Sequence, residues 1–178
     1  KIKTEKTITK QPHPFLQFEK NLVWIDTAGS DAEEGYEKND DSCFNQMEID
    51  LILSLFSDDS PLEDVTILSP YRKQIQLLGL AFKSKFPEAK TLPLIQTIDS
   101  FQGREADTII LSFVRTNDEG EIGFLKDYRR LNVGLTRAKE NLILIGNSVT
   151  LSEDKLYNRL LSTVKEIGEY RSIFEFLY

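Results

Sequence analysis

The chain has 178 residues, a net charge of −7 and a hydrophobic content of 40%. A chain of this length can bury one core without disulfide or metal support, and its ordinary composition excludes the disordered, collagen-like and low-complexity classes. No apolar run approaches the roughly 18 residues that a membrane span needs, so we expect an intracellular protein with no membrane partner. The single cysteine and single histidine, Cys43 and His13, exclude a disulfide framework, a zinc site and most histidine-based catalysis. Any catalysis must rest on Arg, Lys and carboxylates, with no metal bound by this chain.

The charge is distributed unevenly along the sequence. Residues 26–64 contain thirteen Asp and Glu against one base, Lys38. An anion-binding site is therefore expected in the second half of the chain.

The first twenty residues show no sustained period and contain Pro12 and Pro14, which predicts an extended lead-in or linker. Because the first residue is Lys rather than Met, we expect a fragment of a longer protein, with one domain over residues 21–178. Residues 22–25 predict a buried strand. The acidic, Gly-containing segment 31–41 predicts a loop.

From residue 44 onward, helices and strands are expected to alternate. Apolar residues at helical spacing predict a helix from Phe44 to about residue 56, and a second helix that begins at Ser69 and Pro70 and ends before Pro87. Strands are predicted at 65–68, 94–98, 108–114 and 142–145, and further helices at 128–139, 156–168 and 170–177. Short apolar strands that alternate with helices predict an α/β domain of three layers, with a mostly parallel sheet and helices on both faces.

In such sheets ligands bind outside the carboxyl ends of the strands, so polar residues next to strands are candidates. The first such segment is SPYRKQ, which begins at Ser69. Ser69 suits a helix N-cap and Pro70 suits a first helical position, so capping explains these two residues as well as binding does. Tyr71 and Gln74 are not explained by capping.

The second segment, QTIDSFQGRE, ends at Glu105. Gly103 would let backbone N–H groups approach a phosphate, and Glu105 could accept hydrogen bonds from sugar hydroxyls. An ordinary turn does not require Gln, Arg and Glu around one Gly, so this segment favours a binding function.

The third segment, YRRLNVGLTRAK, spans residues 128–139 and holds four cations on one predicted helix. A solvated charged face is the usual explanation. However, Arg130 and Arg137 are predicted beside Leu131 and Leu135, where a partly buried Arg could bind an anion.

SPYRKQ, TIDSFQGREADTIILSFVR and RRLNVGLTRAKENLILIGN, in this order and spacing, resemble motifs IV, V and VI of superfamily 1 helicases. The resemblance is strongest to the branch that contains the nonsense-mediated-decay RNA helicase, senataxin and the immunoglobulin-mu-binding helicase. NLVWIDTAG, NQME and GEIGFLKDYRR extend it, so that it covers about residues 21–150. It implies the second RecA-like domain of a two-domain motor that hydrolyses ATP between its domains and moves along a single strand of RNA or DNA.

The resemblance also implies roles for individual residues. Arg137 would be the arginine finger on the γ-phosphate, and Gly103, Arg104 and Glu105 would bind ATP through backbone, side chain and ribose contacts. The nucleic-acid backbone would lie near the residues that match motif IV (Ser69, Pro70 and Tyr71) and motif V (Thr97, Asp99 and Ser100). It would also lie near Asn45. Tyr71 is a candidate stacking platform. For Asn45, Asn-x-x-Glu is equally a helix-capping pattern.

Two departures from the family pattern matter. Gly134 occupies a position where the family usually has Ala, which should cost the helix roughly 1 kcal/mol. The chain also lacks a G-x-x-x-x-G-K-[ST] motif and a Walker B pair. We therefore expect ATP and Mg²⁺ to be held mainly by a first RecA-like domain outside this chain, and the chain alone to be inactive. The alternative is a non-catalytic, helicase-derived binding or scaffold module.

Overall fold

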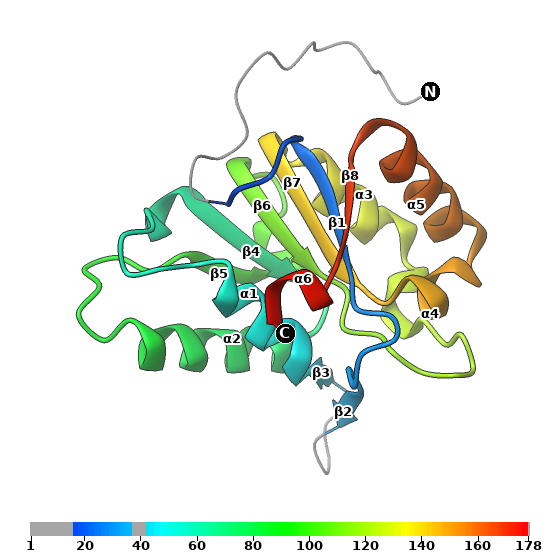
Figure 1. Ribbon diagram of the computed structural model, residues 1–178, viewed down its shortest axis with the longest axis horizontal. Helices are drawn as coiled ribbons and strands as arrows, with labels where there is room; N and C mark the ends of the chain where they lie inside the picture. The colour runs from blue at the N-terminus through cyan, green and yellow to red at the C-terminus, as the bar shows by residue number, and fades with distance from the viewer. Residues whose placement is uncertain (1–15, 37–41, 178) are drawn as a thin grey trace.

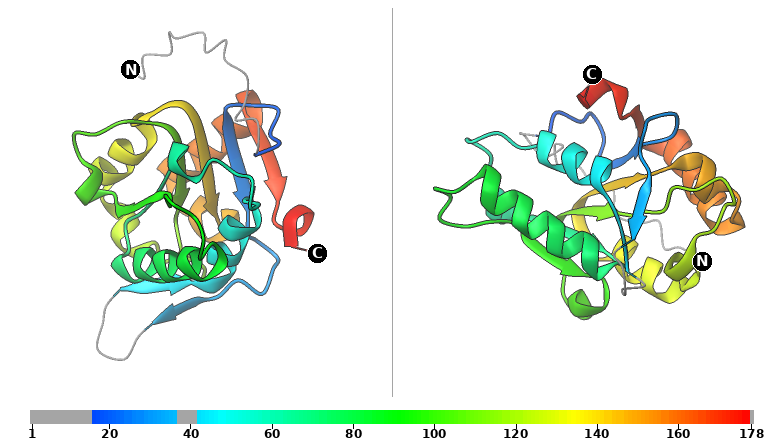
Figure 2. Two further views of the ribbon diagram at one scale, coloured as in Figure 1. Left: turned by 90° about the vertical axis from the view of Figure 1, so that its left-hand side faces the viewer. Right: turned by 90° about the horizontal axis from the view of Figure 1, so that it is seen from below.

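The computed structural model describes residues 16–36 and 42–177, which form a six-stranded sheet between two layers of helices (Figures 1 and 2). The sheet order is β5-β4-β6-β7-β1-β8, and every pair of neighbours is parallel. The strands are β1 (Leu22–Asp26), β4 (Val65–Ser69), β5 (Leu94–Thr97), β6 (Ala106–Ser112), β7 (Ala138–Gly146) and β8 (Glu169–Ser172). The predicted three-layer α/β architecture is confirmed.

The helices divide between the two faces of the sheet (Figure 2). They are α1 (Gln46–Ser54), α2 (Arg72–Lys85), α3 (Tyr128–Thr136), α4 (Ser148–Ser152), α5 (Lys155–Ile167) and α6 (Phe174–Leu177). One core cluster joins α1, α2 and α6 to the sheet, and the other joins α3, α4 and α5 to its opposite face. In β1, Val23 and Ile25 enter the first cluster and Trp24 the second, as alternation along a strand requires. Across the described part of the chain, no helix has the length and apolarity needed to cross a bilayer.

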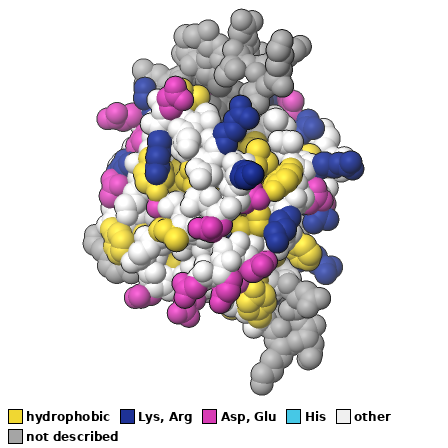
Figure 3. All heavy atoms as spheres, turned by 90° about the vertical axis from the view of Figure 1, so that its right-hand side faces the viewer, with side chains coloured by type: hydrophobic (Ala, Val, Ile, Leu, Met, Phe, Trp, Pro, Cys, Tyr) yellow, Lys and Arg dark blue, Asp and Glu magenta, His cyan; other side chains and the backbone are white. Residues whose placement is uncertain are grey.

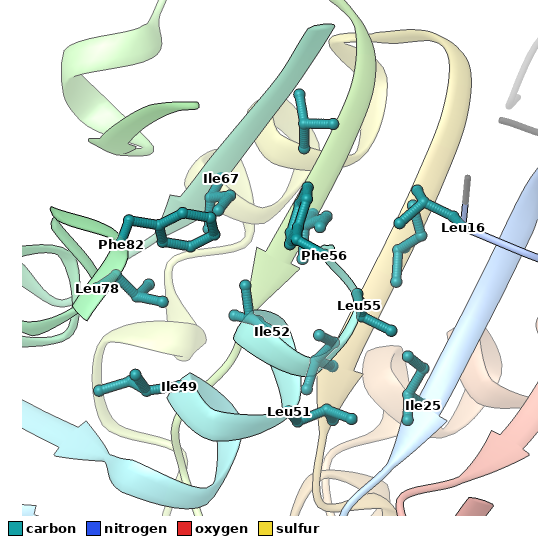
Figure 4. Close-up of a cluster of buried hydrophobic side chains, with 14 of the residues drawn as sticks. Leu16, Ile25, Ile49, Leu51, Ile52, Leu55, Phe56, Ile67, Leu78 and Phe82 are labelled. Atoms are coloured by element: carbon teal, nitrogen blue, oxygen red, sulfur yellow. The ribbon is translucent and has the colours of Figure 1, made fainter. Parts of the chain in front are cut away.

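Figure 4 shows the first cluster, in which α1 and α2 pack on the strands. Ile49 and Ile52 of α1 lie with Leu78 and Phe82 of α2, and all four are fully buried. The rings of Phe56 and Phe82 pack edge to face with centroids 5.3 Å apart. This packing fixes α2, and with it the segment that connects β4 to α2.

The structure corrects the N-terminal predictions in three places. Leu16 and Phe18 are buried in the first cluster, so this end of the predicted lead-in is part of the domain. The predicted acidic loop contains β2 (Glu34–Tyr36), which pairs antiparallel with β3 (Cys43–Asn45), and the first helix consequently begins at Gln46 rather than at Phe44. Residues 1–15 and 37–41 lie outside the described residues.

Two C-terminal predictions are also wrong in part. The helix predicted over 128–139 ends at Thr136, because the backbone of Ala138 pairs with Ala106 and begins β7. The last predicted helix is split into β8 and α6, because Tyr170 pairs with Trp24 at the edge of the sheet. Neither change alters the overall architecture.

Candidate functional site

The predicted site residues lie in two groups at opposite ends of the sheet. Ser69 and Thr97 pair with each other at the carboxyl ends of β4 and β5. Glu105 and Arg137 directly precede β6 and β7, and the Ala106 N–H donates to the Arg137 carbonyl at 3.1 Å. The predicted site residues therefore do not all lie at the carboxyl ends, because the motif around Gly103 and the helix before Arg137 both return to the amino end of the parallel sheet.

The segment between Thr97 and Ala106 crosses from one group to the other. Ile98 and Phe101 are buried in the second core cluster and hold this segment on the face that α3 covers. Gly103 follows with φ +82°, a left-handed conformation that favours Gly, and a Cβ there would have no heavy atom within 4 Å. Open space thus surrounds the turn that precedes β6.

Arg137 has an unsatisfied donor at the amino-end group. It is the C-cap residue of α3, its side chain is half-buried, and its Nε is buried without a hydrogen-bond partner in the described residues. A buried N–H left unpaired costs roughly 1–3 kcal/mol. This position would therefore be stabilised by an anionic acceptor.

The other residues of the amino-end group are exposed. Arg104 donates from Nη1 to Gln96 Oε1 at 3.3 Å, and its guanidinium lies 5.5 Å from the Phe101 ring centroid. Gly103 and Glu105 are both open to solvent. The group therefore supplies two Arg side chains and one carboxylate, while the N–H groups of Arg104 and Ala106 donate to the Phe101 and Arg137 carbonyls.

The exposed part of the carboxyl-end group consists of two hydroxyls and one ion pair. Thr97 Oγ1 and Ser100 Oγ lie 2.8 Å apart, and the Ser100 N–H donates to Thr97 Oγ1 at 3.3 Å. Asp99 accepts from Arg130 Nε at 3.0 Å, and Arg130 lies 3.5 Å from Asp127. One of the two hydroxyl hydrogens forms the bond between Thr97 and Ser100, and the other is available to donate to a ligand.

Ser69 and Tyr71 are buried, whereas Pro70 between them is partly exposed. The Tyr71 N–H donates to Ser69 Oγ at 3.3 Å, but Ser69 is the last residue of β4, and α2 begins at Arg72 with Tyr71 as its N-cap. The predicted N-cap role of Ser69 and the predicted first helical position of Pro70 are therefore wrong. Burial raises the pKa of the Tyr71 phenol, which remains neutral. With 2% of its surface exposed, Tyr71 does not present a ring to solvent, and the stacking platform predicted there is not available in this structure.

The Asn45 side chain is also buried, and it forms hydrogen bonds within the protein. Its side chain caps α1 by accepting from the Glu48 N–H at 3.1 Å, and its Nδ2 donates to the Val114 carbonyl at 3.1 Å. Because Asn45 has no exposed surface, a direct contact with nucleic acid does not fit this structure. The capping interpretation of its motif accounts for it.

A buried polar network that the sequence did not predict lies behind this cap. Glu48 is fully buried; its Oε2 lies 2.5 Å from Ser112 Oγ, and it accepts from the Val114 N–H at 3.0 Å. Gln74 donates to the same Ser112 hydroxyl at 3.0 Å. Burial raises the pKa of Glu48 to about 8. Val114 has φ +72°, which is unusual for a β-branched residue, so this network holds a strained turn after β6.

That turn leads into a second ion pair. Arg115 Nε lies 2.8 Å from Glu34 of β2, and both side chains are about nine-tenths buried, with exposed fractions of 11% and 10%. The Glu34 carboxylate also accepts from the Thr116 N–H at 2.9 Å. The β2–β3 hairpin is therefore tied to the loop after β6. The acidic residues of segment 31–41 are visible in the sequence, but the sequence does not identify Arg115 as the partner of Glu34.

A cavity of about 610 Å³ lies next to the hairpin. Its walls include five carboxylates from the segments after β1, β6 and α4: Glu33, Glu34, Asp118, Glu119 and Glu153. Figure 3, which views the molecule from the side of α5, shows Asp and Glu side chains gathered toward its lower end. Such a lining repels phosphate, and the cavity includes none of the predicted site residues.

Known proteins are similar to this chain in sequence. Residues 1–149 match the sequence family described as an AAA domain. Over 160 residues the chain is 36% identical to the DNA-binding protein SMUBP-2 of Rattus norvegicus, and over 125 residues it is 41% identical to the ATP-dependent helicase NAM7 of Saccharomyces cerevisiae. The chain belongs to the superfamily 1 helicases. These alignments cover 88% and 66% of this helicase domain, but only 16% of SMUBP-2 and 12% of NAM7.

The chain is also similar, at a lower level, to a solved structure. It is the C-terminal domain of a possible DNA helicase from Lactobacillus plantarum, with 15% sequence identity and a TM-score of 0.41. The alignment covers 86% of this helicase domain and 84% of that chain. This likeness is too low to bear on the roles of individual residues.

Proposed function

We propose that the chain is the second RecA-like domain of an ATP-dependent helicase, and that it completes an ATP site whose Mg²⁺ and main phosphate cradle belong to a first domain. The unpaired, buried Nε of Arg137 is the observation that supports this most. Arg is suited to bind a phosphate oxygen, and an arginine finger is worth roughly 10³ to 10⁵ in turnover. In the proposed closed state, Arg137 stabilises the charge that develops on the γ-phosphate.

The neighbours of Arg137 supply the remaining contacts in this proposal. The exposed turn at Gly103 offers backbone N–H groups to phosphate, Arg104 adds a second cation, and Glu105 accepts from the ribose hydroxyls. This donor set fits a nucleoside triphosphate.

The single strand is proposed to run along the carboxyl ends of β4 and β5. Thr97 or Ser100 would donate to phosphate or sugar oxygens, with Asp99 and Pro70 beside them. Such contacts do not read sequence. Ser69, Tyr71 and Asn45 would support this surface from beneath, since all three are buried.

The experiment that tests this proposal is ATP hydrolysis by the full-length protein, with and without single-stranded RNA or DNA. Arg137→Ala should lower strand-stimulated turnover by roughly 10³-fold or more and leave strand affinity close to wild type. Arg159→Ala, which removes an exposed Arg of α5, is the matched control and should retain turnover.

Full turnover in Arg137→Ala would contradict the assigned role. A wild-type protein that binds the strand but hydrolyses no ATP would favour the alternative, a non-catalytic binding module. The strand that stimulates turnover more strongly identifies the substrate as RNA or DNA.

A further inference from the structure

An exposed aromatic ring stands at the carboxyl end of the sheet. Phe124 lies in the 3-10 turn Gly123–Lys126 and is 47% exposed, whereas its neighbours Ile122 and Leu125 are buried. The turn is thus anchored on both sides of Phe124 and holds this ring outward. Neither capping nor core packing requires a phenylalanine there.

Tyr71 supports the Phe124 ring from the protein side. The two ring centroids are 5.6 Å apart with an interplanar angle of 30°, and the Tyr71 hydroxyl donates to the Ile122 carbonyl at 3.4 Å. At Gly123 the backbone has φ +51°, and a Cβ would lie 2.3 Å from Arg115 Nη1 and 3.2 Å from the Tyr71 hydroxyl. Gly123 therefore lets the turn pack closely on Tyr71 and fixes the position of Phe124.

Two predicted motif segments contact Phe124, and a third is connected to it through Arg130. Tyr71 belongs to the first segment, Asp99 to the second and Arg130 to the third. The Arg130 guanidinium lies 5.9 Å from the Phe124 ring centroid and pairs with Asp99, which directly precedes Ser100. Arg130 thus connects the Phe124 ring to the segment that carries the hydroxyls of Thr97 and Ser100.

We propose that Phe124 stacks against a base of the single-stranded nucleic acid, a binding role that rests on the strand path proposed above. Its flat apolar surface suits any base, and base–aromatic stacking is tolerant of sequence. Arg130 pairs with the two nearest carboxylates, Asp99 and Asp127, and so reduces their repulsion of phosphate. Tyr71, the residue first predicted to stack, holds Phe124 in place instead.

The test is the affinity of the full-length protein for a fluorescently labelled oligo(dT) or oligo(U), measured by anisotropy. Phe124→Ala should weaken binding by about 5- to 100-fold, the range expected for one lost base stack. Phe174→Ala is the matched control, because Phe174 is 45% exposed on α6 and lies outside the proposed path. Its affinity should equal that of the wild type.

Two further measurements separate stacking from a structural role. On a strand of the same length with abasic sites, wild type and Phe124→Ala should bind equally. Phe124→Trp should retain affinity, and its added fluorescence relative to wild type should be quenched by the normal strand, since Trp24 of this chain is buried.

Each remaining outcome decides against the inference. If Phe124→Ala binds the normal strand as tightly as the wild type does, stacking is overturned and the proposed function stands. The same conclusion follows if Phe124→Ala loses as much affinity for the abasic strand as for the normal strand. If Phe124→Ala loses only hydrolysis, the ring contacts another domain rather than a base. If the wild type binds neither strand, both the inference and the proposed strand path fail.

Discussion

Glu48 is a carboxylic acid in a fully buried position without a cationic partner. Its oxygens bond to the Ser112 hydroxyl and the Val114 N–H, and burial raises its pKa from 4.5 to about 8. The folded state therefore retains a proton that the unfolded chain releases between these two values. Stability should fall as pH rises through this window, by up to about 1.4 kcal/mol per pH unit, and level off above it.

Glu48→Gln tests this linkage. The amide keeps an acceptor for Val114 and a donor for Ser112 but does not titrate, so we expect this component of the fall in stability between about pH 5 and 8 to disappear. The measurement is urea unfolding of wild type and variant across that range. Parallel pH profiles for the two proteins would show that Glu48 does not carry the buried proton.

At the scale of single residues, the sequence predicted the burial of Arg137 and the cap at Asn45, but not the contacts of Glu48. Arg137 was predicted partly buried, and its Nε is buried. The Asn45-x-x-Glu48 pattern predicted a cap, and Asn45 forms it, but the Glu48 side chain turns inward instead of reaching back to the Asn45 N–H. Local spacing contains no information on Ser112 and Val114, which reach Glu48 only through the fold.

Helices and strands were predictable where their apolar pattern was long. Their ends were less predictable where backbone pairing with another strand determines them. The α2 pattern predicted the body and the end of this helix, but placed its start at Ser69 and Pro70 instead of Arg72, because Ser69 pairs with Thr97 as the last residue of β4. The α3 pattern overran, because only the pairing of Ala138 with Ala106 ends the helix at Thr136. The short hairpin had a weaker signal, Gly35: a Cβ there would lie 2.6 Å from the Phe44 ring across the two strands.

Two helical glycines allow a matched comparison at the element scale. A Cβ at Gly79 of α2 meets nothing within 4 Å, so Gly79→Ala should stabilise the chain by about 0.4–1 kcal/mol. A Cβ at Gly134 of α3 would lie 3.2 Å from Leu111 Cδ2, so Gly134→Ala should gain less, because Leu111 must shift. Thermal unfolding of both variants measures the difference. A larger gain at Gly134 would contradict the tight packing of α3 on β6.

For the whole molecule, the alternation of strands and helices was sufficient to predict a parallel three-layer domain. It was not sufficient to predict that the motifs divide between the two ends of the sheet, because this depends on how the segment after Thr97 crosses to Glu105. That crossing is anchored by buried Ile98 and Phe101. The same short segment thus connects the proposed strand contacts to the proposed ATP contacts, and under the proposed function it would couple closure on ATP to movement of the strand.

The most direct test of this division uses two variants of the full-length protein and measures ATP turnover and strand affinity on both. We expect Arg137→Ala to lose turnover at saturating strand and keep its affinity for the strand. We expect the double variant Thr97→Ala, Ser100→Ala to bind the strand more weakly and recover turnover when the strand is saturating. Equal loss of turnover and affinity in both variants would contradict two separate sites at opposite ends of the sheet.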